Sequence, residues 1–245
     1  MRVFFDLSYR GEPFHGWQVQ PGVVTVQSVI EDALSKLVRQ KVDIVGAGRT
    51  DAGVNARQMI AHCDLPDGFD IGARFLSSLN SLVGRDIAIH SVREVAPDSH
   101  ARFDATERTY RYFVHTGKNP FMRELSWYTF HQLDFDAMNR AGNLILGRRD
   151  FTSFSKLHTD VKTNICDLRT ASWHRFDDDS TRWYFEISAD RFLRNLVRAV
   201  VGTLVDIGRG KFSPESILEV LEAQDRCVAG TSMPAGPLFL WEIKY

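Results

Sequence analysis

The chain begins with an alternation of apolar and polar positions and then changes to a helical period. Apolar side chains lie two apart over residues 3–9, which predicts a strand with one apolar face. A helical period follows over residues 26–38, behind Thr25 and Ser28, residue types that favour the start of a helix. The rest of the first half predicts strands at 42–45, 58–65 and 87–95 and a helix at 71–82.

The second half repeats the same order of strand, helix, strand pair, helix and strand. The pattern predicts strands at 108–115, 165–176, 182–189 and 238–243 and helices at 135–146, 191–205 and 215–223. No residue-level repeat accompanies this order, so the duplication is one of pattern. The boundary is expected between Pro97 and Arg102, giving halves 1–98 and 99–245. The absence of a Gly/Ser-rich linker favours rigid packing of the halves.

Composition narrows the class of protein. The chain has 44% hydrophobic and 25% charged residues among 245, the balance of an ordinary globular protein. Its apolar stretches are far shorter than the roughly 20 residues that span a bilayer, and the first residues do not resemble a signal peptide. We therefore expect no membrane association.

Charge and cysteine content narrow the class further. The three cysteines lie far apart and no histidine has metal-ligand spacing, so we expect no bound metal and no disulfide, and a cytoplasmic location. The net charge of −1 disfavours a general polyanion binder. However, arginines cluster locally, and any RNA affinity is expected from such a focused basic patch. His15, His62 and His158 are interpreted as packing or surface residues.

A glycine-rich stretch from Gly46 to Gly53 is the most informative segment. Three glycines within it allow a tight turn, and Arg49, Thr50 and Asp51 follow one another in the middle. No Gly-Lys-Ser/Thr is present and a strand follows, which disfavours a phosphate-binding loop. A carboxylate in such a bend either caps the turn or acts as a nucleophile or base, and the residues alone favour the turn.

The basic side chains of the helix predicted at 191–205 fall on one stripe. The 100° step of a helix places Arg191, Arg194, Asn195 and Arg198 together, with Gly202 in line, against a wide apolar face. An ordinary solvated face is the commoner use of such arginines. The residues alone therefore favour a solvated face for the stripe.

Several segments, in the same order along the chain, resemble the tRNA pseudouridine synthase A family. The glycine-rich stretch, together with Val54 directly after it, is similar to the catalytic loop of that family. The resemblance covers nearly the whole chain, and its other matching segments are Phe14-His15-Gly16-Trp17-Gln18, His100-Ala101-Arg102-Phe103, Arg108-Thr109-Tyr110-Arg111-Tyr112, Asp150-Phe151-Thr152-Ser153-Phe154, Phe192-Leu193-Arg194-Asn195-Leu196-Val197-Arg198 and Val201-Gly202-Thr203-Leu204, with the closing strand. Two positions depart from the family pattern, Asn55 in place of the usual His and Arg10 in place of a Tyr-Asp-Gly start.

The resemblance implies an α/β fold of two ferredoxin-like halves that form one extended mixed sheet, with the active site in a basic cleft between them. It implies isomerisation of uridine to pseudouridine at positions 38, 39 and 40 of the tRNA anticodon stem-loop, after the base has left the stack. The reaction neither oxidises nor transfers a group, so no cofactor is expected. The expected partners are tRNA and a second copy of the chain in a homodimer.

The same resemblance assigns roles to individual residues. Asp51 becomes the nucleophile, acting on C1′ or C6, or a base at C2′. Arg198 keeps Asp51 ionised and oriented, and Tyr110 stacks on the uracil. Arg49 assists base flipping and Arg102 contacts the RNA backbone.

Two rival functions remain open at this stage. One is an RNA-binding module without isomerase activity. The other is a small-molecule enzyme with a nucleophilic aspartate, which would need further carboxylates near the loop to hold a metal.

Overall fold

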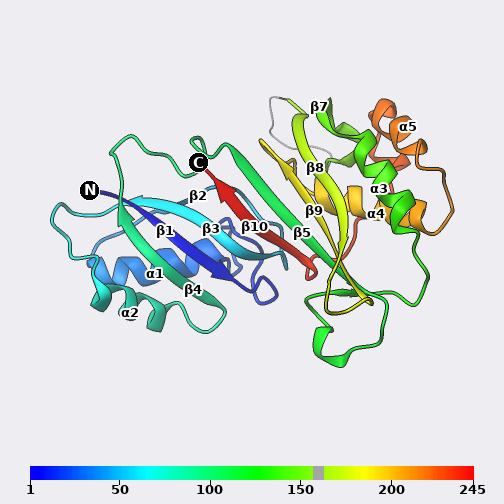
Figure 1. Cartoon of the computed structure of the whole chain (residues 1–245). Coiled ribbons are helices and arrows are strands. Elements are labelled where there is room, and N and C mark those ends of the chain that lie inside the picture. Colours follow the sequence, from blue (N-terminus) through cyan, green and yellow to red (C-terminus); the bar gives the residue numbers. More distant parts are fainter. Residues whose placement is uncertain (157–162) are drawn as a thin grey trace. The chain divides into compact units, whose positions relative to one another are not determined.

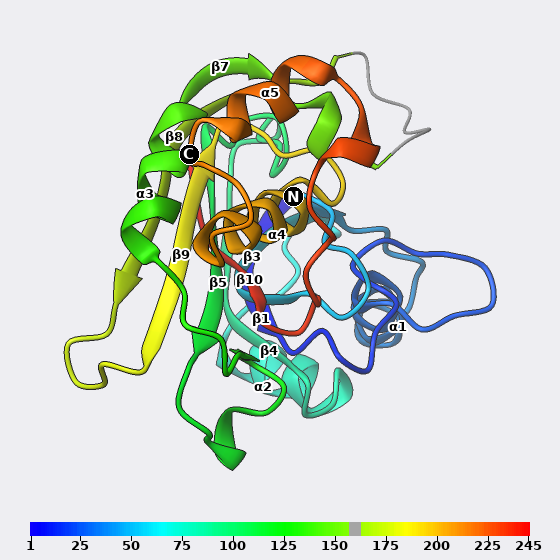
Figure 2. The same ribbon diagram turned by 90° about the vertical axis from the view of Figure 1, so that its right-hand side faces the viewer.

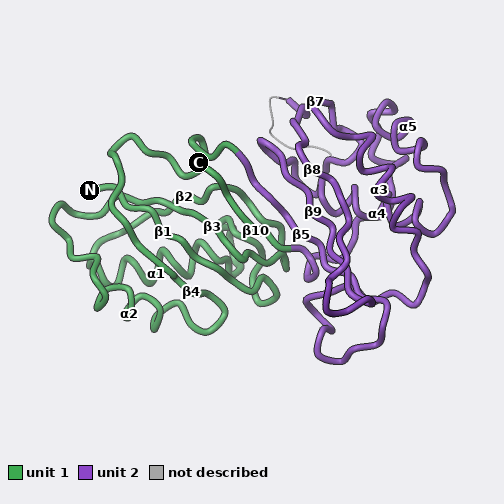
Figure 3. The backbone as a smooth tube through the Cα atoms, viewed as in Figure 1, with its two compact units in different colours: residues 1–106, 239–245 green, residues 107–238 purple. Residues whose placement is uncertain are grey.

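The computed structural model describes residues 1–156 and 163–245, so His158 lies outside the described residues. The chain forms two compact units. Unit 1 contains residues 1–106 and 239–245, and unit 2 contains residues 107–238 (Figure 3). The predicted halves, 1–98 and 99–245, follow the order of elements along the chain, whereas the compact units follow the packing of the backbone. In the packing, the boundary lies at residue 106 and the last strand belongs mostly to unit 1.

Unit 1 consists of a mixed sheet and two helices (Figure 1). The strand order is β4-β1-β3-β10, and β2 pairs with β3 on the side. Strand β3 runs parallel to β10, and the remaining pairs in this unit are antiparallel. The elements are β1 (Arg2–Tyr9), α1 (Val26–Val38), β2 (Val45–Gly46), β3 (Asn55–Asp64), α2 (Ala73–Leu82), β4 (Ile87–Glu94) and β10 (Leu238–Lys244).

The apolar alternation of β1 forms the centre of the unit 1 core. Val3, Phe5 and Leu7 are fully buried and lie opposite small or apolar residues of β3. Helix α1 begins with a capping box, in which Thr25 and Ser28 exchange side-chain and backbone hydrogen bonds. Both the first strand and this helix are therefore confirmed, because period and capping agree locally.

The strand predicted at 42–45 is wrong over most of its length. Only Val45 and Gly46 pair with β3 as β2. The backbone N–H groups of Val42 and Ile44 donate instead to the side chains of Ser35 and Glu31, both in α1. These side-chain acceptors replace a strand partner, so the apolar side chains of Val42 and Ile44 reflect burial and not strand pairing.

Unit 2 also consists of a mixed sheet with helices grouped beside it (Figures 1 and 2). The order β5-β9-β8-β7 is antiparallel, and β6 pairs in parallel with β5. Short 3-10 turns occur at Pro120–Met122, Thr152–Phe154 and Arg226–Val228. The elements are β5 (Glu107–His115), β6 (Trp127–Tyr128), α3 (Phe135–Leu144), β7 (Gly147–Asp150), β8 (Ile165–Arg175), β9 (Arg182–Ala189), α4 (Leu196–Gly208) and α5 (Ser216–Ala223).

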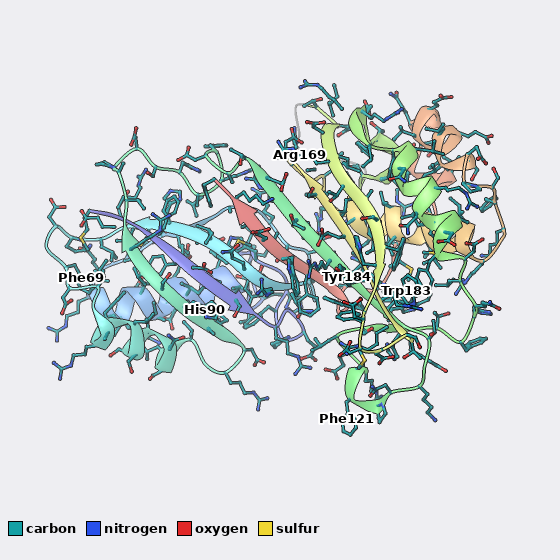
Figure 4. All side chains as sticks on the ribbon, in the orientation of Figure 1. Phe69, His90, Phe121, Arg169, Trp183 and Tyr184 are labelled. Atoms are coloured by element: carbon teal, nitrogen blue, oxygen red, sulfur yellow. The ribbon has the colours of Figure 1, made fainter. Side chains whose placement is uncertain are left out.

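The core of unit 2 is rich in aromatic rings. Tyr112 of β5 and Phe185 of β9 are fully buried and lie opposite each other in the sheet. Trp183 stacks on Phe135 with ring centroids 3.7 Å apart, which ties α3 to β9 (Figure 4). Phe121 contrasts with them, since it is 95% exposed on the connection after β5 (Figure 4).

The helix predicted at 191–205 begins five residues later than expected. Helix α4 starts at Leu196, because Asn195 has a φ of 69°, a left-handed conformation that does not continue a helix. Arg191 and Arg194 therefore precede the helix, and only Arg198 of the three predicted arginines lies within it.

The α/β fold class with mixed sheets is confirmed by these elements. Over the described ranges, no helix has the length and apolar character needed to cross a membrane.

Candidate active site

Residues 46–54, here called the glycine loop, connect β2 to β3 in unit 1. The loop is held at three points by hydrogen bonds. The N–H of Ala47 donates to Ile60 O at 2.8 Å, the hydroxyls of Thr50 and Tyr9 lie 2.8 Å apart, and the N–H of Val54 donates to Asp51 O at 3.1 Å. The backbone on both sides of Asp51 is therefore fixed within unit 1.

The segment 11–17 packs directly against the glycine loop. The N–H of Trp17 donates to Thr50 O at 3.2 Å, and the N–H of Gly53 donates to Phe14 O at 3.4 Å. Two of the matching segments noted in the sequence, around Gly16 and around Asp51, thus lie against each other.

Close backbone approach explains two glycines of this segment. Gly16 has a φ of 86°, and a Cβ on it would lie 2.6 Å from Thr50 O. A Cβ on Gly11 would overlap the Val54 carbonyl. Any larger residue at either position would push the glycine loop away from segment 11–17.

The three central side chains of the loop differ in exposure. Arg49 is exposed, Thr50 is buried, and Asp51 is half-buried. Thr50 thus anchors the loop through Tyr9, while its two charged neighbours remain accessible to a substrate.

Arg102 lies on a separate loop of unit 1 and is exposed. The N–H of Ala101 donates to Nδ1 of His62 at 3.2 Å, and the hydroxyl of Tyr245 donates to Ala101 O at 2.7 Å. His100 packs edge-on against the His62 ring, at 4.6 Å between centroids. Burial, assisted by the nearby His100, lowers the pKa of His62 to about 4, so its Nδ1 remains available as an acceptor at neutral pH.

Tyr110 lies on β5 of unit 2 and is buried, with 8% of its surface exposed. Its ring makes an edge contact with Phe192, with centroids 5.0 Å apart. Two residues further along β5, the hydroxyl of Tyr112 is buried without a hydrogen-bond partner in the described part of the chain. Burial raises the pKa of Tyr112, and the positive charge of Arg198 opposes this rise.

Arg198 is half-buried in the first turn of α4. Its Nε donates to Met233 O at 2.5 Å, and Met233 N in turn donates to Arg198 O at 3.1 Å. The predicted solvated stripe is therefore not what surrounds this residue, because a later segment of the chain covers it.

The five predicted site residues divide between the units. Arg49, Asp51 and Arg102 belong to unit 1, and Tyr110 and Arg198 belong to unit 2. Among residues 1–156 and 163–245, no group of three or more His, Cys, Asp or Glu side chains is arranged to hold a metal ion.

Sequence reasoning missed several residues that hold the site together. Asn55, noted only as a departure from the family pattern, is 1% exposed and accepts from Gly11 N at 2.8 Å. Trp17 lies against Gly46, and Met233 binds Arg198. The only signal in the sequence was the presence of Trp17 beside Gly16 in a matching segment.

Comparison with known proteins identifies the family of this chain. The profile of a family described as tRNA pseudouridine synthase matches residues 141–245. The tRNA pseudouridine synthase A of Bacteroides thetaiotaomicron is 50% identical over 244 residues, covering 100% of this chain and 90% of its own. The enzyme of the same name from Parabacteroides distasonis is 51% identical, with 100% and 96% coverage, and that from Bacillus subtilis is 38% identical, with 100% and 99% coverage. The chain therefore belongs to the tRNA pseudouridine synthase A family.

Proposed function

We propose that this protein isomerises uridine to pseudouridine in tRNA, at positions 38, 39 and 40 of the anticodon stem-loop, with Asp51 as the nucleophile. The observation that supports this most is the glycine loop, whose backbone is held on both sides of a half-buried carboxylate. The family's full-length relatives bear the name of that activity.

The chemistry assigns a task to each group. The N1–C1′ bond of uridine breaks, the uracil rotates, a C5–C1′ bond forms, and the proton on C5 leaves while N1 gains one. A carboxylate at Asp51 acts on C1′ or C6 as nucleophile, or on C2′ as base. In this proposal Arg198 is the charged partner of that carboxylate.

The remaining residues act on the base and the RNA. The ring of Tyr110 stacks on the detached uracil, and its hydroxyl assists removal of the C5 proton. Arg49, which is exposed on the glycine loop, fills the space that the flipped base leaves. Arg102, also exposed, contacts the RNA backbone.

The assembly and location are part of the same proposal. We propose a homodimer that works in the cytoplasm, where its tRNA substrate is found. Cys63, Cys166 and Cys227 are free thiols in the structure, which fits a reducing compartment. Light scattering over a range of protein concentrations measures the mass of the particle in solution. A monomer at every concentration would contradict the proposed dimer.

The function is tested on an unmodified tRNA transcript. Wild-type protein and Asp51→Ala protein are incubated with it, and pseudouridine is mapped along the RNA. We expect modification at the three anticodon stem-loop positions with wild-type protein and none with the variant. Wild-type protein that binds tRNA without forming pseudouridine would instead identify an RNA-binding module.

A further inference from the structure

The first turns of α4 are covered by residues 229–233, here called the covering segment. It precedes β10 in the chain and lies within unit 2. Arg198 and Met233 form reciprocal hydrogen bonds, from Arg198 Nε to Met233 O at 2.5 Å and from Met233 N to Arg198 O at 3.1 Å. The guanidinium and the backbone carbonyl of Arg198 are thus both hydrogen-bonded to the backbone of Met233 in the covering segment.

A second attachment lies one turn earlier, at Asn195. This residue is the N-cap of α4, but its side chain forms no capping hydrogen bond. Its Nδ2 donates instead to the hydroxyl of Ser232 at 2.8 Å, and Arg226 Nη2 donates to the same oxygen at 2.8 Å. Asparagine tolerates the left-handed φ of 69° found here, and the amide that usually caps a helix is directed to the covering segment.

A third attachment lies one turn later and depends on two glycines. A Cβ on Gly202 would overlap the carbonyl oxygen of Thr231, and a Cβ on Gly230 would lie 2.6 Å from Thr203 N. The N–H of Gly230 donates to the hydroxyl of Thr203 at 2.9 Å. Backbone therefore packs on backbone here, and Gly202 is explained by this contact.

The three attachments follow the spacing of one helix face, at Asn195, Arg198 and Gly202. We propose that the covering segment is the positioning element for the Arg198 guanidinium in the isomerisation. A guanidinium is planar, so binding of Nε to a fixed carbonyl sets the plane of the whole group and the direction of Nη1 and Nη2. This inference rests on the proposed function, because it requires Arg198 to act in the reaction.

The test measures pseudouridine formation over a range of tRNA concentrations, which gives kcat and KM, in two variants of these contacts. Ser232→Ala removes the acceptor for Asn195, and we expect kcat to fall about tenfold with KM unchanged. Gly202→Ala displaces the covering segment, and we expect a fall of about 100-fold. The matched control is Gly208→Ala on the same helix. The Cβ that this variant adds meets the flexible side chain of Met138 and not the covering segment. This control retains wild-type kcat if the inference holds.

A double-variant comparison distinguishes positioning of the Arg198 guanidinium from a general effect on the structure. In an Arg198→Lys background, which lacks the Nε donor, Ser232→Ala should cause no further fall in kcat. An equal tenfold fall in both backgrounds would overturn the inference, as would wild-type kcat in Ser232→Ala protein when Arg198→Lys is impaired. Ser232→Ala is sufficient for this decision if Gly202→Ala fails to fold. A wild-type protein that forms no pseudouridine would overturn the proposed function as well, which distinguishes the two failures.

Discussion

The glycine loop of unit 1 and the start of α4 in unit 2 hold their charged side chains in different ways. Around Asp51, the contacts are made mainly by backbone groups, from Trp17, Gly53 and Val54. Around Arg198, side chains contribute as well, through the guanidinium and through Asn195, in addition to the close backbone contact of Gly202 with Thr231. An added methyl group on a neighbouring glycine would therefore displace the loop. At α4, a change of side chain alters the geometry directly.

The largest effect is expected from removing the charge at Arg198. Arg198→Met keeps much of the aliphatic stem but lacks the charge and the hydrogen bond to Met233 O. We expect kcat/KM to fall about 1,000-fold, the upper end of the effect of removing one charge-stabilising donor from a reaction site. The measurement is pseudouridine formation on transcript tRNA, with circular dichroism as the control for the fold. Near-normal turnover of folded variant protein would remove Arg198 from the proposed site.

Adding a methyl group beside the glycine loop tests the other half of the comparison. Gly16 and Gly22 both have positive φ, at 86° and 76°, but only Gly16 lies against the loop, near Thr50 O. Gly22→Ala is expected to lower the free energy of unfolding by about 1 kcal/mol through backbone strain, and Gly16→Ala by about 3 kcal/mol through strain and overlap. Urea denaturation of both variants measures this. Equal losses would show that the contact with the loop contributes nothing.

Two tyrosines of β5 give a paired test in unit 2. Tyr110→Phe removes a hydroxyl assigned to the reaction, and we expect kcat to fall about 100-fold. Tyr112→Phe removes a buried hydroxyl that has no hydrogen-bond partner among the described residues, and we expect unchanged or higher stability, by up to about 1 kcal/mol, with activity retained. Kinetics and thermal unfolding of both variants distinguish the roles. A severe loss of activity in Tyr112→Phe would give its hydroxyl a part in the reaction.

The last prediction concerns His62, which accepts a hydrogen bond from the loop that carries Arg102. Because burial lowers the pKa of His62 from 6.5 to about 4, the folded protein disfavours its protonation, and stability is lost as the pH falls from about 6.5 toward 4. We expect a loss of roughly 2 kcal/mol between pH 7.5 and pH 5 from this residue. His62→Gln should show a smaller decrease over that range. Urea denaturation at the two pH values checks this, and an identical decrease in both proteins would exclude His62 as the cause.

Local patterns predicted most of the elements correctly. Residues 3–9 and 26–38 are a strand and a helix because alternation, helical period and the capping pair Thr25 and Ser28 all act over short distances. The pattern failed at 42–45 and at the start of α4. At 42–45 the acceptors come from Ser35 and Glu31, and before α4 the left-handed Asn195 directs its side chain to a residue 37 positions away.

The candidate site shows the same division. A segment such as Gly46-Ala47-Gly48-Arg49-Thr50-Asp51 is read directly from the chain, and its assignment as the catalytic loop stays a prediction. The hydrogen-bond partners of Asn55, His62 and the covering segment, which are Gly11, Ala101 and α4, were not predicted. Nothing in the spacing of these residues along the chain indicates those pairs.

By itself, the sequence determined the α/β class, the order of most elements and which loop carries the proposed nucleophile. These follow from periodicity and from short runs of residues, whose physical causes are local. Only the tertiary structure decided where the boundary between the compact units lies. It also decided that segment 11–17 packs against the glycine loop and that residues 229–233 cover Arg198. Such contacts join residues far apart in the chain, and their geometry depends on how the whole backbone packs.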